Sequence, residues 1–197
     1  MNNGDVSQSR RRFLIGATSV VGGVGVVGAA VPFVASWNPS AKAEAAGAPV
    51  TVNISKIEPG QQITVAWRGK PVWIVRRTEE MLANIKKLND RVKDPQSKDA
   101  DQPDYIEGIY RSLKDEYVVL VGICTHLGCV PTFRPEVAPA DVGDDWLGGF
   151  ICACHGSRYD LAGRVFQNQP APANLEVPPY RYDDDNTIVV GLDPEAA

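Results

Sequence analysis

Two short runs of sequence decide how this chain folds: Cys124-Thr-His-Leu-Gly-Cys129 and Cys152-Ala-Cys-His-Gly-Ser157. Together they hold all four cysteines and both histidines of the 197 residues. Cysteines and histidines that serve ordinary packing are usually scattered along a sequence. Their concentration in two runs therefore indicates a metal centre or a redox site.

Three kinds of centre use these residue types. A structural zinc site would take two cysteines and two histidines and leave Cys129 and Cys154 without a role. A cluster on four cysteines would leave both histidines unused. We favour a 2Fe–2S cluster with one iron on two cysteines and the other on two histidines, because the remaining two cysteines are then placed to bridge the two loops as a disulfide, and all six residues have a role.

The two runs resemble the ligand boxes of the Rieske iron–sulfur subunit of bacterial cytochrome bc complexes, and the resemblance covers essentially the whole chain. It implies four cluster ligands, with the cysteines on the buried iron and the histidines on the outer iron: Cys124, Cys152, His126 and His155. It also implies a disulfide between Cys129 and Cys154. Two departures remove no ligand: Ala153 replaces the usual proline, and the segment Val130–Ile151 is longer than in mitochondrial relatives.

The same resemblance implies roles for residues around the cluster. The hydroxyls of Ser157 and Tyr159 match those that hydrogen-bond a bridging sulfide and a ligand sulfur, which raises the reduction potential. Cover for the cluster is implied for Leu127 and for the loop Gln169-Pro-Ala-Pro172, through Pro170 and Pro172. In that loop Gln169 stands where glycine is usual.

Imidazole ligands have a redox consequence. Replacing two anionic thiolates by neutral imidazoles lowers the negative charge around the cluster, so that Rieske centres reach about −150 to +300 mV. Reduction also makes a ligand imidazole a stronger base, which couples electron uptake to proton uptake. The resemblance implies that His155 hydrogen-bonds the quinol and accepts its proton.

Taken together, the resemblance implies the electron-transfer subunit of a respiratory quinol–cytochrome c oxidoreductase, a proton-translocating complex. The cluster would take one electron from ubiquinol at the outer quinol site and pass it to a c-type cytochrome. The implied partners are cytochrome b, a c-type cytochrome, ubiquinol and membrane lipid, in a dimeric complex. The chain alone has no complete active site, because it carries no haem motif and no quinone-binding membrane bundle.

The N-terminus resembles a twin-arginine export signal in Ser9-Arg-Arg-Arg-Phe-Leu14. The apolar run from Phe13 to Val34 would span roughly 33 Å as a helix, enough to cross a hydrocarbon core. Ala41-Lys-Ala43 offers a cleavage site, but signal-peptide apolar regions are only about 7–15 residues long. We therefore expect a bacterial inner-membrane protein with a cytoplasmic N-terminus (1–12), an uncleaved transmembrane anchor (13–37) and a periplasmic head.

The remainder reads as a small-residue linker or hinge (38–48) and a head (49–197). The resemblance implies a mainly β fold, an antiparallel β-sandwich with a small cluster-binding subdomain at about 120–165. Strand-like runs are expected at 50–54, 62–67, 72–76, 117–123, 150–153 and 187–192. A helix from about Glu79 to Asp90 is expected behind a Thr78 cap, and 93–104 should be irregular. The formal charge of −4 argues against nucleic-acid binding, because nucleic acids are themselves negatively charged.

Two further hypotheses stay open at this stage. A Rieske domain that serves an oxygenase would share the four ligands, but such domains lack the second cysteine of each box and are usually cytosolic. The small subunit of an exported molybdenum enzyme such as arsenite oxidase can share both the disulfide and the export signal. The anchor, the long segment Lys70–Glu116 and the proline loop favour the quinol-oxidising complex.

Overall fold

The computed structural model describes residues 7–194 and divides the chain into two units, Met1–Ala45 and Ala46–Ala197. The first six residues of the expected cytoplasmic segment (1–12) and the last three of the expected head (49–197) lie outside the described residues. Each unit is described by itself.

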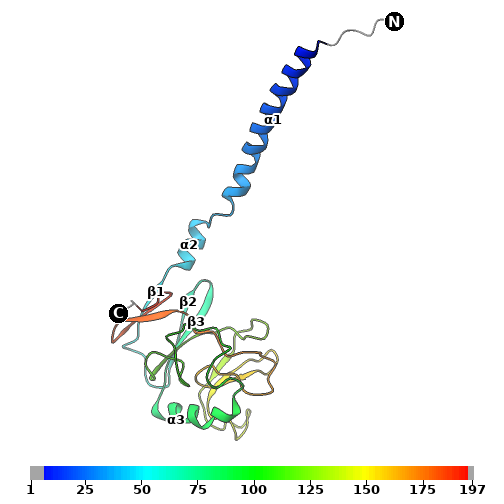
Figure 1. The fold of residues 1–197 in the computed structure, drawn as a ribbon. Helices are drawn as coiled ribbons and strands as arrows, with labels where there is room; N and C mark the ends of the chain where they lie inside the picture. The colour runs from blue at the N-terminus through cyan, green and yellow to red at the C-terminus, as the bar shows by residue number, and fades with distance from the viewer. Residues whose placement is uncertain (1–6, 195–197) are drawn as a thin grey trace. The chain divides into compact units, whose positions relative to one another are not determined.

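The N-terminal unit is built on one long helix, α1 (Gln8–Ala35; Figure 1). It has 28 residues, none of them buried, and its most apolar window has a mean hydropathy of 2.0. By length and composition α1 can cross a membrane. It begins before the expected anchor and includes the three arginines. A short helix, α2 (Ala41–Gly47), lies within the expected linker, in keeping with its many alanines.

Three antiparallel sheets of three strands each make up the described part of the head (Figure 1). The first has the order β1-β9-β8, with β1 at Val50–Asn53, β9 at Thr187–Val190 and β8 at Tyr180–Asp184. The second is β2 (Gln62–Trp67), β3 (Lys70–Arg76) and β4 (Tyr117–Val121). The third is β5 (Thr132–Arg134), β6 (Gly149–Ile151) and β7 (Arg158–Tyr159).

Each of the six expected strand runs overlaps a strand, although β3 and β6 begin before their runs and several strands end early. The mainly β fold with an N-terminal apolar helix is therefore confirmed. The strands β5, β7 and β8 were not expected. The first two have only three and two residues, and β8 reads Tyr-Arg-Tyr-Asp-Asp. Such segments pair because their neighbours hold them in place, and their own composition gives little signal.

The expected helix is α3 (Glu79–Lys87). Thr78 caps it, because its Oγ1 accepts a hydrogen bond from the backbone N–H of Met81 at 3.2 Å. The helix is shorter than expected, since Asn89–Arg91 form a 3-10 turn. Met81, Ile85 and Leu88 are buried and Leu82 is half-buried, and 93–104 is irregular as expected.

A core of apolar side chains joins the second sheet to the third. Trp73 of β3 stacks on Phe150 of β6, with ring centroids 4.9 Å apart and an interplanar angle of 7°. Both side chains are buried. Because β4 leads to the first cysteine box and β6 to the second, this contact lies where both ligand loops leave the sheets.

Three buried arginines hold the turn that follows the second box. Arg77, Arg111 and Arg164 are almost fully buried, and Arg164 pairs with the buried Asp160 at 2.8 Å. Other N–H groups of the three guanidinium ions donate to backbone carbonyls in and around the turn. These are the carbonyls of Leu161, Ala162, Gly163, Leu175 and Ile85. Burial lowers the pKa of Arg77 and Arg111 to about 10, so both remain charged at neutral pH. Carbonyl partners offset the cost of burying these cations.

Candidate metal centre

The first box is a tight loop closed by two backbone hydrogen bonds. The N–H of Cys124 donates to the carbonyl of Cys129 at 2.7 Å, and the N–H of Gly128 donates to the carbonyl of Cys124 at 3.0 Å. The chain thus turns back on itself between its two cysteines. This closure presents the intervening residues, His126 among them, at the end of the loop.

The second box repeats this pattern. The N–H of Cys152 donates to the carbonyl of Ser157 at 2.8 Å, and the N–H of Gly156 donates to the carbonyl of Cys152 at 2.9 Å. Gly128 and Gly156 occupy the same place in their loops, with φ of 82° and 76°. Residues with side chains rarely adopt this left-handed conformation. The two boxes are therefore one loop form used twice.

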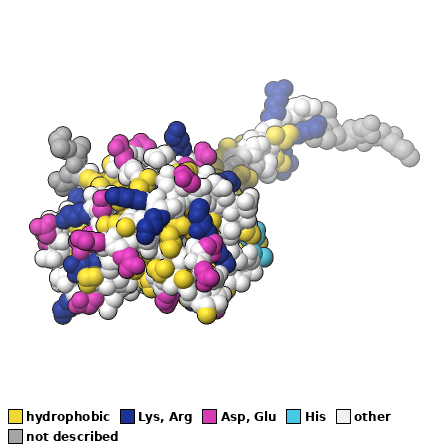
Figure 2. Space-filling model, turned by 90° about the horizontal axis from the view of Figure 1, so that it is seen from below, with side chains coloured by type: hydrophobic (Ala, Val, Ile, Leu, Met, Phe, Trp, Pro, Cys, Tyr) yellow, Lys and Arg dark blue, Asp and Glu magenta, His cyan; other side chains and the backbone are white. Residues whose placement is uncertain are grey.

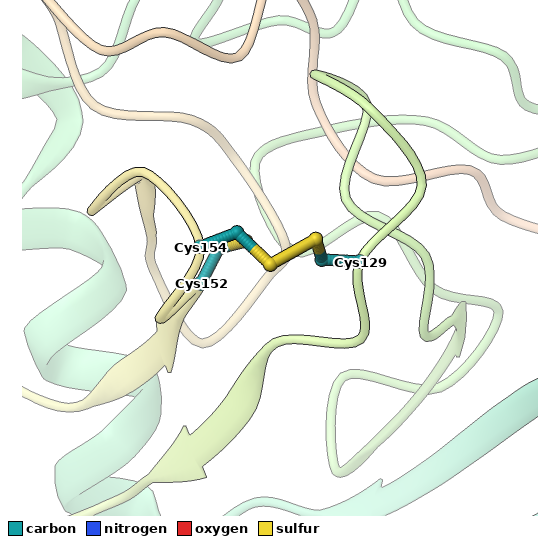
Figure 3. Close-up of side chains that lie close together, drawn as sticks. All are labelled: Cys129, Cys152 and Cys154. Atoms are coloured by element: carbon teal, nitrogen blue, oxygen red, sulfur yellow. A yellow bond between two sulfur atoms is a disulfide. The ribbon is translucent and has the colours of Figure 1, made fainter.

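A disulfide between Cys129 and Cys154 ties the two loops together (Figure 3). The pairing implied by the resemblance is thus present, with the two Cα atoms 6.7 Å apart. Sγ of Cys152 lies within 4.8 Å of both disulfide sulfurs. These three sulfurs are not a ligand set, because two of them are bonded to each other. The disulfide leaves Cys124 and Cys152 as the two free thiols.

The four expected ligands are graded in exposure. Cys124 and Cys152 are each 2% exposed, whereas His126 is half-buried and His155 is exposed. The imidazole rings lie together, with centroids 4.7 Å apart and an interplanar angle of 84°. Histidine side chains reach the surface at one edge of the head in Figure 2. Two inner thiols and two outer imidazoles fit a cluster with one iron on sulfur and the other on nitrogen.

The two free thiols differ in their acidity. Burial raises the pKa of Cys124, but hydrogen bonds from Tyr159, the backbone of His126 and Cys152 outweigh that effect and lower the pKa below its usual value. Burial raises the pKa of Cys152, and the nearby Cys124 adds to this rise. The hydrogen bonds to Cys124 thus favour its thiolate, the form that binds iron, more than the surroundings of Cys152 do.

Tyr159 contacts the first box directly. Its hydroxyl lies 3.2 Å from Sγ of Cys124 and accepts a hydrogen bond from the N–H of Thr125 at 3.2 Å. Burial raises the pKa of Tyr159, which keeps its proton in place. A thiolate has no proton to give, so a ligand sulfur at Cys124 would accept the hydrogen bond from Tyr159.

The loop 169–173 is bonded to both boxes. The N–H of Ala171 donates to Oγ of Ser157 at 3.1 Å, and Oγ1 of Thr125 donates to the carbonyl of Ala173 at 2.7 Å. Gln169 contributes through its side chain, whose Oε1 accepts the N–H of Arg158 at 3.1 Å. The backbone is left-handed at Asn168, which precedes Gln169 and has a φ of 57°. The departure at Gln169 thus adds a bond between this loop and β7.

The residues expected to cover the cluster lie in two places. Leu127 is 71% exposed at the tip of the first box. Pro170 and Pro172 are exposed, and Ala171 between them is buried. Ser157 is fully buried. Covering the cluster remains a proposal for the three exposed residues.

Sequence reasoning missed Thr125 and the two loop glycines. Thr125 connects Tyr159 to the loop 169–173, and a threonine between two ligands gives no sign of such contacts. Gly128 and Gly156 did carry a signal, because each stands four residues after the first cysteine of its box.

The paired loops, the disulfide and the graded ligands together define a Rieske iron–sulfur protein, and residues 48–180 match the family described as Rieske [2Fe-2S] domain. Residues 1–40 match the family described as "Ubiquitinol-cytochrome C reductase Fe-S subunit TAT signal". The chain belongs to the ubiquinol–cytochrome c reductase iron–sulfur subunits. Its cofactor is therefore a Rieske 2Fe–2S cluster, which sets aside the structural zinc site.

Several relatives of the chain are named ubiquinol–cytochrome c reductase iron–sulfur subunit. The one from Allochromatium vinosum is 58% identical and covers 95% of this chain and 91% of its own. The one from Bradyrhizobium diazoefficiens is 42% identical over 93% of this chain and 94% of its own. The mitochondrial "Cytochrome b-c1 complex subunit Rieske" of Saccharomyces cerevisiae is 37% identical over 95% of this chain and 78% of its own.

Proposed function

We propose that this chain carries one electron from ubiquinol to a c-type cytochrome as a subunit of a respiratory cytochrome bc complex. The single observation that carries the proposal is the graded site, in which the exposed His155 stands beside His126 above two buried thiols. When bound, the 2Fe–2S cluster supplies a one-electron acceptor of high potential.

Residues of the chain would bind the cluster, accept the proton of quinol and exclude water. Cys124 and Cys152 would hold one iron of the cluster through their buried sulfurs. His126 and His155 would hold the other, and His155 is exposed enough to form a hydrogen bond with quinol and accept its proton. This coupling lets a quinol lose a proton and an electron at one place. Leu127, Pro170 and Pro172 surround the site and exclude water from it.

The N-terminal unit serves attachment and export. We infer that α1 crosses the bacterial inner membrane once, with the N-terminus in the cytoplasm and the head in the periplasm. The twin-arginine match supports export of the folded head with its cluster already in place. Residues 38–48 form the hinge between the anchor (13–37) and the head, and the cluster-binding subdomain extends over about 120–165.

The partners follow from this placement. Cytochrome b would supply the quinol site and a c-type cytochrome would take the electron, within a dimeric complex that translocates protons. The tip of the head at Leu127 and His155 is the surface that would meet the quinol site. Membrane lipid would surround α1.

Membrane fractionation tests this function. We expect the chain in the membrane fraction, copurifying with cytochromes b and c after detergent extraction. The reduced sample should give the low-average-g electron paramagnetic resonance (EPR) signal of a mixed Cys/His cluster. Recovery in the soluble periplasmic fraction, beginning after Ala43 and together with a molybdenum protein, would favour the exported molybdenum enzyme instead.

Tyr159→Phe should leave the cluster in place but lower its midpoint potential. The lost hydrogen bond to Cys124 no longer offsets the charge of the reduced state, an effect of up to about 60 mV if the bond contributes about 1.5 kcal/mol. Redox titration followed by EPR measures this shift. Ser157→Ala should act in the same direction.

Tyr182→Phe is the matched control for that substitution. The Tyr182 hydroxyl is buried on β8, and within the described residues it has no hydrogen-bond partner. Its removal should leave the potential unchanged. An unaltered midpoint in Tyr159→Phe would contradict the tuning role.

A further inference from the structure

Trp73 contacts the chain just before the second ligand box. Its side chain is 2% exposed and stacks face to face on Phe150, with the ring centroids 4.9 Å apart. Phe150 stands two residues before Cys152 on β6. The position of the Trp73 ring therefore limits where the second ligand loop can begin.

The same side chain also meets the chain just before the first box. A Cβ atom added to Gly122 would lie 2.3 Å from Cε2 and 2.5 Å from Cζ2 of Trp73. Gly122 stands two residues before Cys124, and it is not among the glycines with positive φ. The backbone conformation at residue 122 is thus open to residues other than glycine. Glycine is needed because the indole of Trp73 occupies the space that a Cβ atom would fill.

The two ligand loops are thus connected at two places. The disulfide between Cys129 and Cys154 joins the loops themselves, and the indole of Trp73 contacts the residue that precedes each loop by two positions, Gly122 and Phe150. We propose that Trp73 is a positioning residue, which sets the separation of the two loops and through it the geometry of the cluster. The proposal rests on Cys124 and Cys152 as cluster ligands.

The head contains a matched control for this contact. Trp67 lies on the neighbouring strand β2, is 3% exposed, and likewise covers a glycine, since a Cβ on Gly191 would meet its Nε1 at 2.5 Å. Gly191 follows β9 and belongs to neither box. Substituting Trp67 therefore removes an equally buried indole from the same sheet without touching the base of either ligand loop.

The test compares four variants in the full-length, membrane-bound protein: Trp73→Phe, Gly122→Ala, their combination, and Trp67→Phe. Three quantities are measured: the EPR g-values and line widths of the reduced cluster, its midpoint potential, and the rate of cluster loss to an iron chelator. Thermal unfolding reports the general destabilisation in each variant.

Trp73→Phe and Gly122→Ala should each alter the EPR signal and lose the cluster roughly tenfold faster than the parent, because a void or an overpacked contact shifts the loop bases. Trp67→Phe should lower the unfolding temperature and leave the EPR signal unchanged. In the combined variant the smaller ring makes room for the added methyl. The double variant should therefore lie closer to the parent than Gly122→Ala does.

Two results would overturn the proposal. One is a Trp73→Phe cluster with the parent EPR signal and parent rate of loss. The other is a strictly additive double variant, which would mean that the two positions do not act through one contact. If Gly122→Ala fails to fold, the comparison of Trp73→Phe with Trp67→Phe still decides. A parent protein without the mixed Cys/His signal would instead contradict the ligand assignment and the proposed function.

Discussion

Replacing His155 by alanine is expected to remove both the cluster and ubiquinol oxidation. The outer iron would lose one of its two imidazoles, at the ligand position most exposed to water. Losing a group that only supports a metal ligand costs about 10–100-fold in affinity or activity. Loss of the ligand itself should cost more, and the variant should fall to background turnover.

Purified membranes of the His155→Ala strain measure this directly. The reduced sample should lack the Rieske EPR signal, and quinol-dependent cytochrome c reduction should vanish, while cytochromes b and c stay spectrally intact. Asp185→Ala serves as control, because its side chain is 95% exposed on a surface turn and pairs with the exposed Lys114, away from both boxes. A cluster that persists in His155→Ala at parental occupancy would show that another residue binds the outer iron.

The second large effect is expected from Cys129→Ala/Cys154→Ala. This disulfide closes a loop with a sequence separation of 25, for which chain entropy predicts about 3.5 kcal/mol of stability. The loss should also affect the cluster, because the covalent link between the two loops would be gone and only non-covalent contacts, such as those of Tyr159, the loop 169–173 and Trp73, would still hold them. We expect faster bleaching of the cluster on heating and a lower unfolding temperature.

The double variant is needed because each single variant leaves a free thiol beside Cys152, whose sulfur lies within 4.8 Å of both partners. That thiol would compete with Cys152 for the iron and confuse the result. Visible circular dichroism follows the cluster, and calorimetry follows the head. A double variant that bleaches and unfolds with the parent would rule out a structural role for the disulfide.

The place of the candidate site, its cofactor and its disulfide could be predicted from the sequence, because six metal-binding or redox residues stand in two runs. A cluster on two cysteines and two histidines leaves the other two cysteines for the disulfide. Core strands could be predicted as well. Tyr117–Val121, for example, is a continuous apolar run in the sequence and is buried throughout in the structure. Thr78 predicted the start of α3, because its hydroxyl can cap the first turn of a helix.

What could not be predicted depends on contacts between distant segments. β7 has two residues, and only its pairing with β6 makes it a strand. The indole of Trp73 lies on Gly122, and the guanidinium of Arg111 reaches the carbonyls of Ala162 and Leu175. Local sequence patterns do not predict such contacts between distant residues, because the contacts arise when the sheets pack together.

The pairing of β1 with β9 has a consequence for biosynthesis. Val50 pairs with Val190 and Asn53 with Thr187, so the first strand of the head finds its partner in the last one. A nascent chain emerges from its N-terminus, and the export signal therefore reaches the cytosol long before β9 is made. The first sheet of the head therefore cannot form until β9 has been synthesised, so the export signal is exposed before the head can fold completely.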